Sequence, residues 1–291
     1  MRVVITGGAG LIARYTSLRL AVGGHEVVLF DRYPLPESGS ADPLRRMRVE
    51  LGDVMDRAAC VRVCEGAEGV IHLAGIKTPV PECFEINTVG TWNILEAARQ
   101  VGVQRVVLAS SINGIGIGWH ITMQPFALVE YVPIDEEQPV HPEDSYSLSK
   151  WLNELTAAGF TQAYGLKTAA LRYAGVYTPT RSQALAANPP EPTFTRSDSG
   201  YQGIWGYVDV RDVAQANCKA LLAPGLLPAG AYYISAADTT SPVETMELLR
   251  RFLPHWVPKA RGIVGRQSLF SCAKAATAFG YKPEYSWTQY R

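Results

Sequence analysis

The sequence has no surplus of charge of either sign and no long apolar run. Among its 291 residues, 27 are Lys or Arg and 27 are Asp or Glu, so the basic excess that would bind a nucleic-acid backbone or an anionic membrane is missing. No apolar run is long enough to cross a bilayer, and Met1 leads directly into a strand pattern without a charged leader. We therefore expect no nucleic-acid partner, no membrane partner, no export and no membrane insertion.

Cysteines and histidines are also few. The cysteines are odd in number and form no Cys-x-x-Cys pair; they are Cys60, Cys64, Cys83, Cys218 and Cys272. This pattern favours reduced, buried thiols over a disulfide framework or a zinc cage, and it indicates a cytoplasmic protein. No two histidines, and no His/Cys pair, have the spacing of metal ligands, so no metal is expected.

Apolar runs rich in β-branched residues alternate with segments of helical period, which is typical of βαβ units around a buried parallel sheet. The predicted strands are Val3–Thr6, Glu26–Phe30, Arg48–Glu50, Gly69–Leu73, Arg105–Ala109 and Lys167–Tyr173. The predicted helices between them are Leu11–Val22, Arg57–Cys64, Val89–Val101 and Ser145–Tyr164. The fold class is therefore α/β, with a Rossmann-type doubly wound sheet.

A small C-terminal lobe that binds the substrate is expected beside this sheet. Residues 1–177 form the dinucleotide-binding domain, and residues 205–234, read as a short strand and a helix, return to it. Residues 178–204, rich in Pro, Ser and Gly, form the lobe together with residues 235–291, where Pro242–Phe252 is a further helix candidate. No repeat or linker splits the chain into independent domains.

A glycine-rich turn follows the first strand. Residues Thr6–Ala13 contain Gly8, Gly10 and Ala13 in a Gly-x-Gly-x-x-Ala pattern that opens the first helix. Such a turn brings the backbone close to a pyrophosphate, and the helix N-terminus supplies free N–H groups and a positive dipole. The alternative is an ordinary glycine turn, but its place between strand and helix favours a dinucleotide site.

Asp31 ends the second strand, about 20 residues past the glycines, where its carboxylate can accept hydrogen bonds from the adenosine ribose. The carboxylate would repel a 2′-phosphate, which favours NAD over NADP. Arg32 follows directly and can contact such a phosphate, so NADP remains the alternative. Asp31 can also be read as a turn residue at a strand end.

Tyr146 and Lys150 lie four residues apart at the start of a predicted helix and share one face. A phenol is a weak base at neutral pH, but an adjacent ammonium and the positive nicotinamide ring stabilise its phenolate. Tyr146 can then accept a proton as hydride leaves a substrate carbon. Alone, a Tyr-x-x-x-Lys spacing is more often an exposed pair on a helix surface. The other motifs in this chain favour a catalytic pair.

The chain resembles the extended short-chain dehydrogenase/reductase family, specifically the NAD-dependent epimerase/dehydratase group, over nearly its whole length. The matching segments are Thr6–Ile12, Gly52–Val54, His72–Lys77, Asn87–Ala98, Ala109–Ser111, Tyr146–Lys150, Leu171–Tyr173 and Tyr207–Ala214. The Ser111–Gly116 turn resembles uronate dehydrogenases more than typical epimerases of this group.

The resemblance implies a catalytic set of Ser111, Tyr146 and Lys150, with Ser111 bonding the reacting oxygen. Ser110 is a rival, because a register slip of one residue in the strand would exchange the two. Asn87 is expected on the helix behind the site, or as a helix N-cap. The expected cofactor contacts are Gly7, Gly10, Leu11, Ile12, Asp31, Arg32, Asp53, Val54, Leu73, Ala74, Gly75, Lys77, Ala109, Tyr146, Lys150 and Tyr173.

Two anion-binding groups of the sugar-nucleotide epimerases are missing. Ala174-Gly175 stands where an aromatic and an asparagine usually follow the Arg-Tyr pair, and Gln202–Tyr207 lacks the usual arginine. The expected substrate is therefore a small sugar, sugar acid or polyol. Arg181 and Arg196 are the candidates to restore an anion site, although solvated loop charge is the favoured interpretation. The expected substrate contacts are Lys77, Ser111, Asn113, Gly175 and Trp205. Among the histidines, only His120, beside Trp119, is placed to touch substrate, and His72 is expected to be a core residue.

Three functions are compatible with these motifs. The leading one is an NAD-dependent oxidoreductase that moves a hydride between nicotinamide and a hydroxyl-bearing carbon of a small carbohydrate. The alternative is an NAD-dependent sugar or nucleotide-sugar epimerase or dehydratase, similar to UDP-glucose 4-epimerase, and the third is a non-catalytic redox sensor. Relatives pair the helices at Val89–Val101 and Ser145–Tyr164 in a four-helix seam, so a homodimer is expected by analogy.

Overall fold

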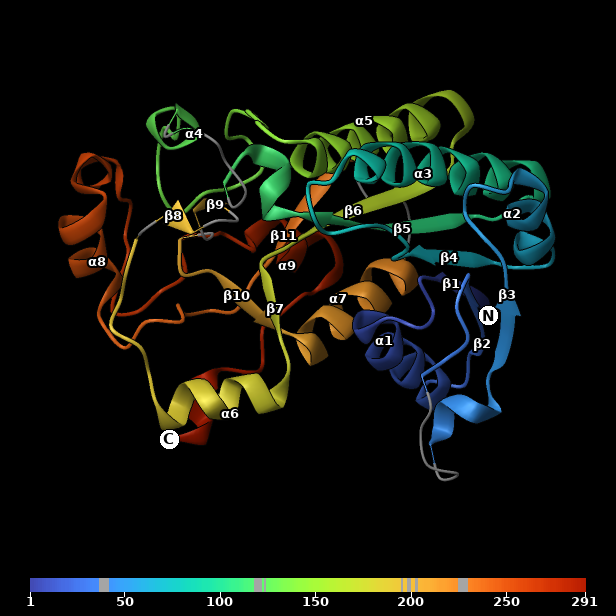
Figure 1. Cartoon of the computed structure of the whole chain (residues 1–291), viewed down its shortest axis with the longest axis horizontal. Coiled ribbons are helices and arrows are strands. Elements are labelled where there is room, and N and C mark those ends of the chain that lie inside the picture. Colours follow the sequence, from blue (N-terminus) through green and yellow to red (C-terminus); the bar gives the residue numbers. More distant parts are fainter. Residues whose placement is uncertain are drawn as a thin grey trace.

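A seven-stranded parallel sheet forms the centre of the molecule in the computed structural model (Figure 1). The structure describes residues 1–36, 42–117, 122, 124–194, 196–197, 200–201, 204–224 and 230–291. From one edge to the other, the strands are β11 (Ala231–Ile234), β6 (Lys167–Tyr173), β5 (Arg105–Ser111), β4 (Gly69–His72), β1 (Arg2–Thr6), β2 (Glu26–Asp31) and β3 (Arg48–Leu51). The strand order reverses between β1 and β4, which is where such sheets bind ligands at their carboxyl ends.

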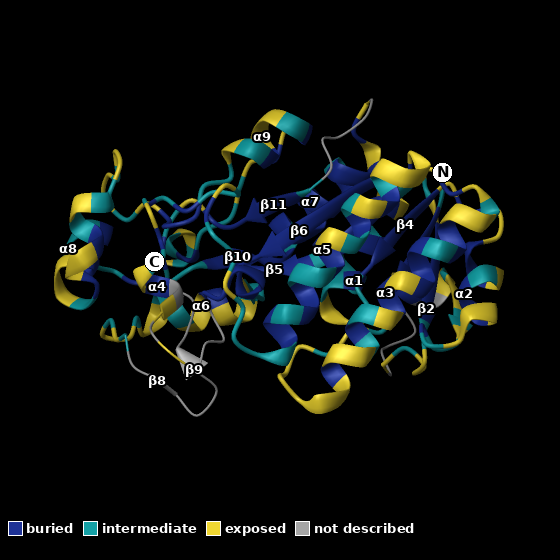
Figure 2. Ribbon diagram, turned by 90° about the horizontal axis from the view of Figure 1, so that it is seen from above, coloured by how far each residue is buried: buried dark blue, intermediate teal, exposed yellow. Residues whose placement is uncertain are grey.

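Helices cover both faces of the sheet, so its inner strands are apolar on both sides. Val3 and Ile5 of β1 point into a core shared with α1 (Leu11–Val22) and α7 (Val210–Leu222). Val4 points to the opposite core, shared with α2 (Arg57–Cys64), α3 (Pro81–Val101) and α5 (Ser145–Tyr164). In Figure 2 the strands are dark blue between helices that turn their exposed residues outward. The predicted Rossmann-type sheet is confirmed.

The predicted elements agree with the structure to within a few residues, with two exceptions. Helix α3 begins at Pro81 instead of Val89, because Pro81 fits the first helical turn, where no backbone donor is needed. The predicted strand after Trp205 forms as β10 (Tyr207–Asp209), but it pairs with β7 (Gly175–Tyr177) in a separate two-stranded sheet. Of the returning segment, α7 and β11 therefore pack on or join the central sheet, and β10 does not.

A group of smaller elements lies at one end of the sheet, beside its carboxyl edge (Figure 1). They are α4 (Gln124–Ala127), α6 (Pro179–Ala187), β8 (Arg196–Ser197), β9 (Gly200–Tyr201) and α8 (Thr245–Phe252), with 3₁₀ turns at Pro254–Lys259 and Trp287–Tyr290. Helix α9 (Ala273–Phe279) instead packs beside the edge strand β11. Segment 124–134, outside the predicted lobe, packs here too: the Trp256 indole donates to the Phe126 carbonyl at 2.8 Å. The division of the chain into two domains stays a prediction.

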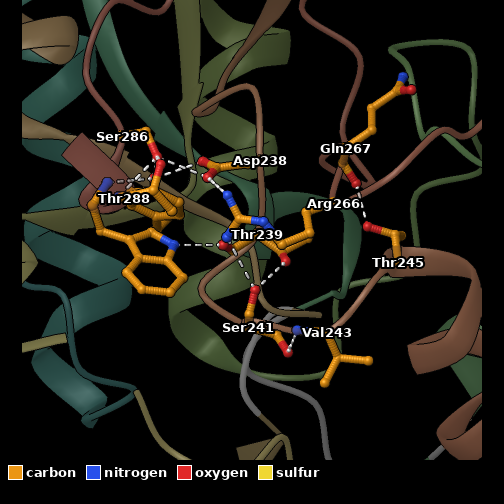
Figure 3. A network of polar contacts seen from close by, with 11 residues as sticks. Asp238, Thr239, Ser241, Val243, Thr245, Arg266, Gln267, Ser286 and Thr288 are labelled. Atoms are coloured by element: carbon orange, nitrogen blue, oxygen red, sulfur yellow. Dashed lines mark hydrogen bonds and ion pairs between the residues drawn. The ribbon is translucent and has the colours of Figure 1, made fainter. Parts of the chain in front are cut away.

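Asp238 ties the C-terminal segment to this group of elements (Figure 3). Its carboxylate accepts hydrogen bonds from Arg266 at 2.8 Å, from Ser286 at 2.8 Å and from Tyr207 at 2.7 Å. The Trp287 indole donates to the Thr239 carbonyl at 2.8 Å. The network holds the end of the chain against the start of β10.

No helix among the described residues has the length and apolar character needed to cross a membrane.

Candidate functional site

A cleft of about 270 Å³ opens at the point where the strand order reverses. Nine of the residues that line it were predicted to contact the cofactor: Gly7, Gly10, Asp31, Arg32, Asp53, Val54, Leu73, Ala74 and Gly75. Five further lining residues, Phe30, Tyr33, Gly52, Ile76 and Ile86, were not predicted. The carboxyl ends of β1, β2 and β4 thus build one continuous wall.

The turn between β1 and α1 lies very close to the chain after β4. Gly7 has a left-handed backbone with φ of 67°, and a Cβ placed on it would lie 2.8 Å from the Ala74 nitrogen. Gly10 caps α1, and a Cβ there would lie 3.0 Å from the Gly7 carbonyl oxygen. A larger residue than glycine would therefore be strained at both positions. No side chain caps the start of α1, so its first N–H groups are left free at this turn.

Asp31, at the end of β2, connects the turn after β1 to the segment after β2. Its carboxylate accepts the Ala9 N–H at 3.0 Å and the Tyr33 N–H at 3.0 Å. Arg32 lies 4.0 Å from the Asp53 carboxylate, with its guanidinium 4.9 Å from the Tyr33 ring centroid. A carboxylate is therefore fixed where ribose hydroxyls would bind, and the adjacent arginine is engaged by Asp53 and Tyr33.

His72 is a core residue, as predicted. Its ring bonds the Thr6 hydroxyl at 2.7 Å and the Thr91 hydroxyl at 3.1 Å. Burial, with the nearby charge of Lys150, lowers the pKa of His72 to about 3, which keeps the ring neutral. The Thr6 hydroxyl also accepts the N–H groups of Leu73 and Ala74, so the pair joins β1 to the loop that lines the cleft.

Asn87 holds the loop after β4, which lines the cleft, against α5. Its side-chain oxygen accepts the Ile76 N–H at 2.8 Å, and its amide group donates to the Ile76 carbonyl at 2.9 Å. The same amide group donates to Ser149 at 3.0 Å, and Ser149 donates to the Tyr146 carbonyl at 2.7 Å. Asn87 lies inside α3 and not at its start, so the interpretation as a helix N-cap is wrong.

Ser111, Tyr146 and Lys150 meet where β5 ends and α5 begins. The Ser111 side chain lies near enough to Tyr146 to lower the pKa of its phenol, and the Lys150 amine donates to the Ala109 carbonyl at 3.0 Å. A Cβ placed on Gly75 would lie 3.7 Å from the Lys150 nitrogen. The Lys150 amine therefore adjoins the cleft at Gly75, although none of these three residues lines the cleft itself.

Burial controls the protonation of both groups of the pair. Burial raises the pKa of Tyr146 to about 12, opposed by the Ser111 hydrogen bond, and burial lowers the pKa of Lys150 to about 8. The expected stabilisation of the phenolate by the Lys150 ammonium and the nicotinamide ring together stays a prediction, and in the protein alone desolvation of the phenol has the largest effect on its pKa. The Lys150 amine is also directed to the Ala109 carbonyl, with its nitrogen 5.6 Å from the Tyr146 ring centroid.

The register of β5 separates Ser111 from its rival Ser110. The Ser110 hydroxyl donates to the Glu154 carboxylate at 2.5 Å, deep under α5. The Ser111 side chain instead lies near the Tyr146 phenol, whose pKa it lowers, and its hydroxyl accepts the Asn113 N–H at 3.1 Å. Ser111 is therefore the serine next to the tyrosine.

Several predicted residues lie outside the cleft walls. They are Leu11, Ile12, Lys77, Ala109 and Tyr173. Tyr173 is buried, and its hydroxyl donates to Asn217 of α7 at 2.6 Å. Leu11, at the start of α1, is exposed, and so is Lys77, in the loop after β4.

Of the predicted substrate contacts, Asn113 is buried in the 3₁₀ turn Ile112–Ile115, directly after Ser111. Gly175 begins β7 and pairs with Tyr207. The Trp205 indole donates to the Thr193 carbonyl at 3.1 Å and packs on Phe194 and Phe252. These three contacts and Lys77 stay predictions.

Of the candidate anion-binding residues, Arg181 is exposed, with its guanidinium 3.9 Å from the Tyr177 ring centroid. Arg196 is the first residue of strand β8, and its role in anion binding stays a prediction. Trp119, His120, Gln202 and Gly203 lie outside the described residues.

The cleft suits a dinucleotide. It offers a glycine cradle at a helix N-terminus for the pyrophosphate, a carboxylate for the ribose, and apolar walls at Phe30, Val54 and Ile86. Its far end adjoins Lys150, so a bound dinucleotide would extend toward Tyr146. No group of three or more His, Cys, Asp or Glu side chains among the described residues is arranged to hold a metal ion.

Known proteins share this architecture. The model of the NAD dependent epimerase/dehydratase family matches residues 3–234. A UDP-glucose 4-epimerase of Lacticaseibacillus casei is 28% identical, covering 98% of this chain and 92% of its own length. A uronate dehydrogenase of Pseudomonas syringae pv. tomato is 30% identical, covering 59% and 58%. The solved UDP-glucose 4-epimerase of Thermus thermophilus in complex with NAD is 26% identical, with a TM-score of 0.66 and coverage of 98% and 94%.

The family match spans the whole central sheet and the cleft at its carboxyl edge. The glycine cradle, Asp31 and the Ser111–Tyr146–Lys150 group all fall within the matched residues. The chain therefore belongs to the NAD dependent epimerase/dehydratase family, and it is an NAD-dependent enzyme.

Proposed function

We propose that this enzyme oxidises a hydroxyl-bearing carbon of a small sugar or sugar acid and passes the hydride to NAD. The observation that carries the proposal is the meeting of Ser111, Tyr146 and Lys150 beside Gly75, at the end of a cleft that suits a dinucleotide. A protein that only bound the dinucleotide would have no use for a tyrosine, a serine and a lysine at that end.

Each of the three side chains has one task in this proposal. NAD supplies the hydride acceptor and a positive ring when bound. The Tyr146 oxygen accepts the proton of the substrate hydroxyl as the carbon loses hydride, so a carbonyl forms and the tyrosine gains the proton. Ser111 donates a hydrogen bond to the reacting oxygen, and the charged Lys150 stabilises the phenolate form of Tyr146.

Asp31 supports NAD over NADP as the cofactor. Its carboxylate is held by two backbone N–H groups. If the adenosine ribose binds there, as proposed, a 2′-phosphate would meet a negative charge. Arg32, the residue that favours the phosphate, lies 4.0 Å from Asp53.

The substrate is proposed to be a free sugar or sugar acid and not a nucleotide sugar. Ala174 and Gly175 follow Arg172-Tyr173, so the position after Tyr173 offers no side-chain amide for a diphosphate. Each missing charge-assisted hydrogen bond would remove about 1.5–3 kcal/mol from diphosphate binding. Arg172 cannot replace them, because it is buried and bonded to Glu154 at 2.8 Å.

A panel of aldoses, uronic acids and nucleotide sugars, each incubated with enzyme and NAD, tests the proposal through NADH absorbance. We expect NADH to accumulate with a free sugar or uronic acid. The Tyr146→Phe variant should lose about 10²–10⁴-fold in rate while its NAD affinity, measured by calorimetry, stays within about twofold. Tyr281→Phe removes another buried hydroxyl, bonded to the Ser235 carbonyl, and should leave the rate unchanged. Unchanged turnover in Tyr146→Phe would refute the assigned base.

The second candidate is an epimerase, because a relative that covers 98% of this chain is a UDP-glucose 4-epimerase. In that reaction the hydride returns to the substrate, and NAD is regenerated in place. Conversion of a nucleotide sugar without any rise in NADH would favour this candidate. The same panel therefore separates the two.

We further propose that the enzyme is a cytoplasmic homodimer. The cysteine pattern supports a reducing compartment, since the five free thiols are buried or nearly so. Partly exposed apolar side chains on α3 and α5 support pairing of two copies: Phe84, Val89, Trp92, Leu155 and Tyr164.

A further inference from the structure

A buried ion pair lies under the catalytic helix. Glu154 follows Lys150 by one turn of α5, and Arg172 belongs to β6. The Arg172 guanidinium donates two parallel hydrogen bonds to the Glu154 carboxylate, at 2.9 and 2.8 Å. The side chains are only 5% and 7% exposed, so both charges are held inside the protein.

The pair joins the catalytic helix to three strands. Ser110 of β5 donates to Glu154 at 2.5 Å, and Arg172 donates to the Tyr233 hydroxyl of β11 at 3.3 Å. The turn at Gly114 closes the remaining side, since a Cβ placed there would lie 3.6 Å from both the Glu154 carboxylate and the Lys150 Cβ. These contacts fix the rotation of α5 about its axis, and that rotation sets the directions of Tyr146 and Lys150.

Such a pair is weak evidence for stability, because well-packed apolar side chains often replace a buried ion pair without loss. Its place next to Lys150 suggests another role. Lys150 is buried with its amine on the Ala109 carbonyl, so a charged Lys150 depends on the electrostatics of its surroundings.

The titratable groups around Lys150 come from several elements. Cys83 of α3 raises the pKa of Lys150, Lys150 lowers the pKa of His72 of β4, and the Tyr146 ring lies with its centroid 5.6 Å from the Lys150 nitrogen. Burial keeps these three side chains uncharged near neutral pH. Asp144 acts on Tyr146 and Cys83. Glu154 is the carboxylate that favours the charged amine, and Arg172 balances Glu154 from the far side.

We propose that Glu154 and Arg172 are positioning residues, whose buried ion pair orients α5 and keeps two opposite charges in balance beneath Lys150, the lysine that assists proton transfer at Tyr146. The inference rests on the proposed function, since it assigns the pair a task in that reaction. Neither residue touches substrate or cofactor. Both act through Lys150.

Opposite charges predict opposite effects. If Lys150 must be charged, and if the positive ring of bound NAD brings the Tyr146 pKa below that of Lys150, the rate of sugar oxidation falls as pH rises through the pKa of Lys150, and this alkaline limb reports its protonation. Glu154→Gln leaves the Arg172 cation unbalanced and should move the limb to lower pH by about one unit. Arg172→Met leaves the carboxylate unbalanced and should move it to higher pH. The double variant should return it close to the original position.

The experiment measures the pH dependence of NADH formation with the best sugar of the panel, together with near-UV circular dichroism to check folding. Arg172→Lys keeps the charge but loses the paired hydrogen bonds, and it serves as the matched control with an unmoved limb. Single variants that lose activity without a shift, or that shift in the same direction, would overturn the inference. If Glu154→Gln does not fold, Arg172→Met and the double variant decide in the same way.

Tyr146→Phe, measured alongside, separates this inference from the proposed function. Loss of activity in Tyr146→Phe with an unmoved limb in Glu154→Gln would refute the positioning role alone. Full activity in Tyr146→Phe would refute the assigned base, and the role of the pair with it.

Discussion

Lys150 is a buried amine, and burial makes its charged form less stable in the folded protein than in the unfolded chain. Burial lowers its pKa from 10.5 to about 8, so between these pH values the unfolded chain binds the proton more tightly than the folded chain. By linkage, the contribution of Lys150 to stability is unfavourable at neutral pH and rises as pH increases from about 8 toward 10.5. The folded protein keeps this unfavourable charge where the proposed reaction requires it.

Replacing Lys150 with Met should remove that pH dependence. The difference in free energy of unfolding, wild type minus Lys150→Met, should increase by up to about 3 kcal/mol between pH 7 and 10.5. Urea unfolding at a series of pH values measures it. The comparison must be a difference because burial also raises the pKa of Cys60 and Cys64, which lowers stability at high pH in both proteins.

Lys282→Met, which removes an exposed lysine, is the control for the loss of a lysine. A difference between wild type and Lys150→Met that stays constant across this pH range would contradict the low pKa of Lys150. Activity should be lost in Lys150→Met whatever its stability, since the phenolate of Tyr146 would lack its cation.

At the scale of elements, the turn between β1 and α1 can be tested with a pair of glycines. Gly7 and Gly24 both have left-handed backbones, with φ of 67° and 77°. A Cβ on Gly7 would lie 2.8 Å from the Ala74 nitrogen, whereas a Cβ on Gly24 meets nothing within 4 Å. Both substitutions by alanine force a left-handed residue, but only one presses the turn against the cleft loop.

Gly24→Ala should therefore lower the free energy of unfolding by about 1–2 kcal/mol and leave NAD binding unchanged. Gly7→Ala should lower it further and weaken NAD binding at least tenfold, because Gly7 and Ala74 both line the cleft. Urea unfolding and calorimetric titration with NAD measure the two effects. Equal effects on NAD affinity in both variants would show that the close approach at Gly7 does not shape the site.

The elements also explain what the sequence could predict. Strands β1, β2 and β4 are apolar on both faces; β1 ends directly before Gly7, β2 ends at Asp31 and β4 ends at His72, so their bounds follow from composition to within a residue or two. The start of α3 was missed because its first turns, with Pro81, Glu82 and Glu85, carry no apolar period. The wall residue Ile86 was missed with it.

The remaining misses depend on contacts between distant segments. Phe30 is an apolar strand residue by pattern, and its ring reaches the cleft because Gly52 leaves room for it: a Cβ on Gly52 would lie 2.5 Å from the Phe30 ring. The effect of burial on Tyr146, whose pKa it raises to about 12, could not be predicted from the sequence either. Desolvation depends on packing around the hydroxyl, which spacing along a helix does not report.

At the scale of the whole molecule, the outer face of α3 and α5 remains to be explained. The two helices lie side by side over one face of the sheet (Figure 1). Trp92 of α3 is 47% exposed and Leu155 of α5 is 51% exposed. Apolar side chains grouped on neighbouring helices indicate an interface, and a second copy placed by a twofold axis would bury the same residues on both chains.

We expect sedimentation equilibrium to give twice the chain's 31.7 kDa. Leu155→Glu would place two carboxylates in a self-complementary interface and should give a monomer with an unchanged circular dichroism spectrum. Trp92 is less suited to the test because its ring also packs on Phe160, with 5.1 Å between centroids. Val264→Glu, on a side chain that is 77% exposed in the C-terminal segment, should remain dimeric. A wild-type monomer at micromolar concentration would refute the homodimer, and a dimeric Leu155→Glu would place its interface elsewhere.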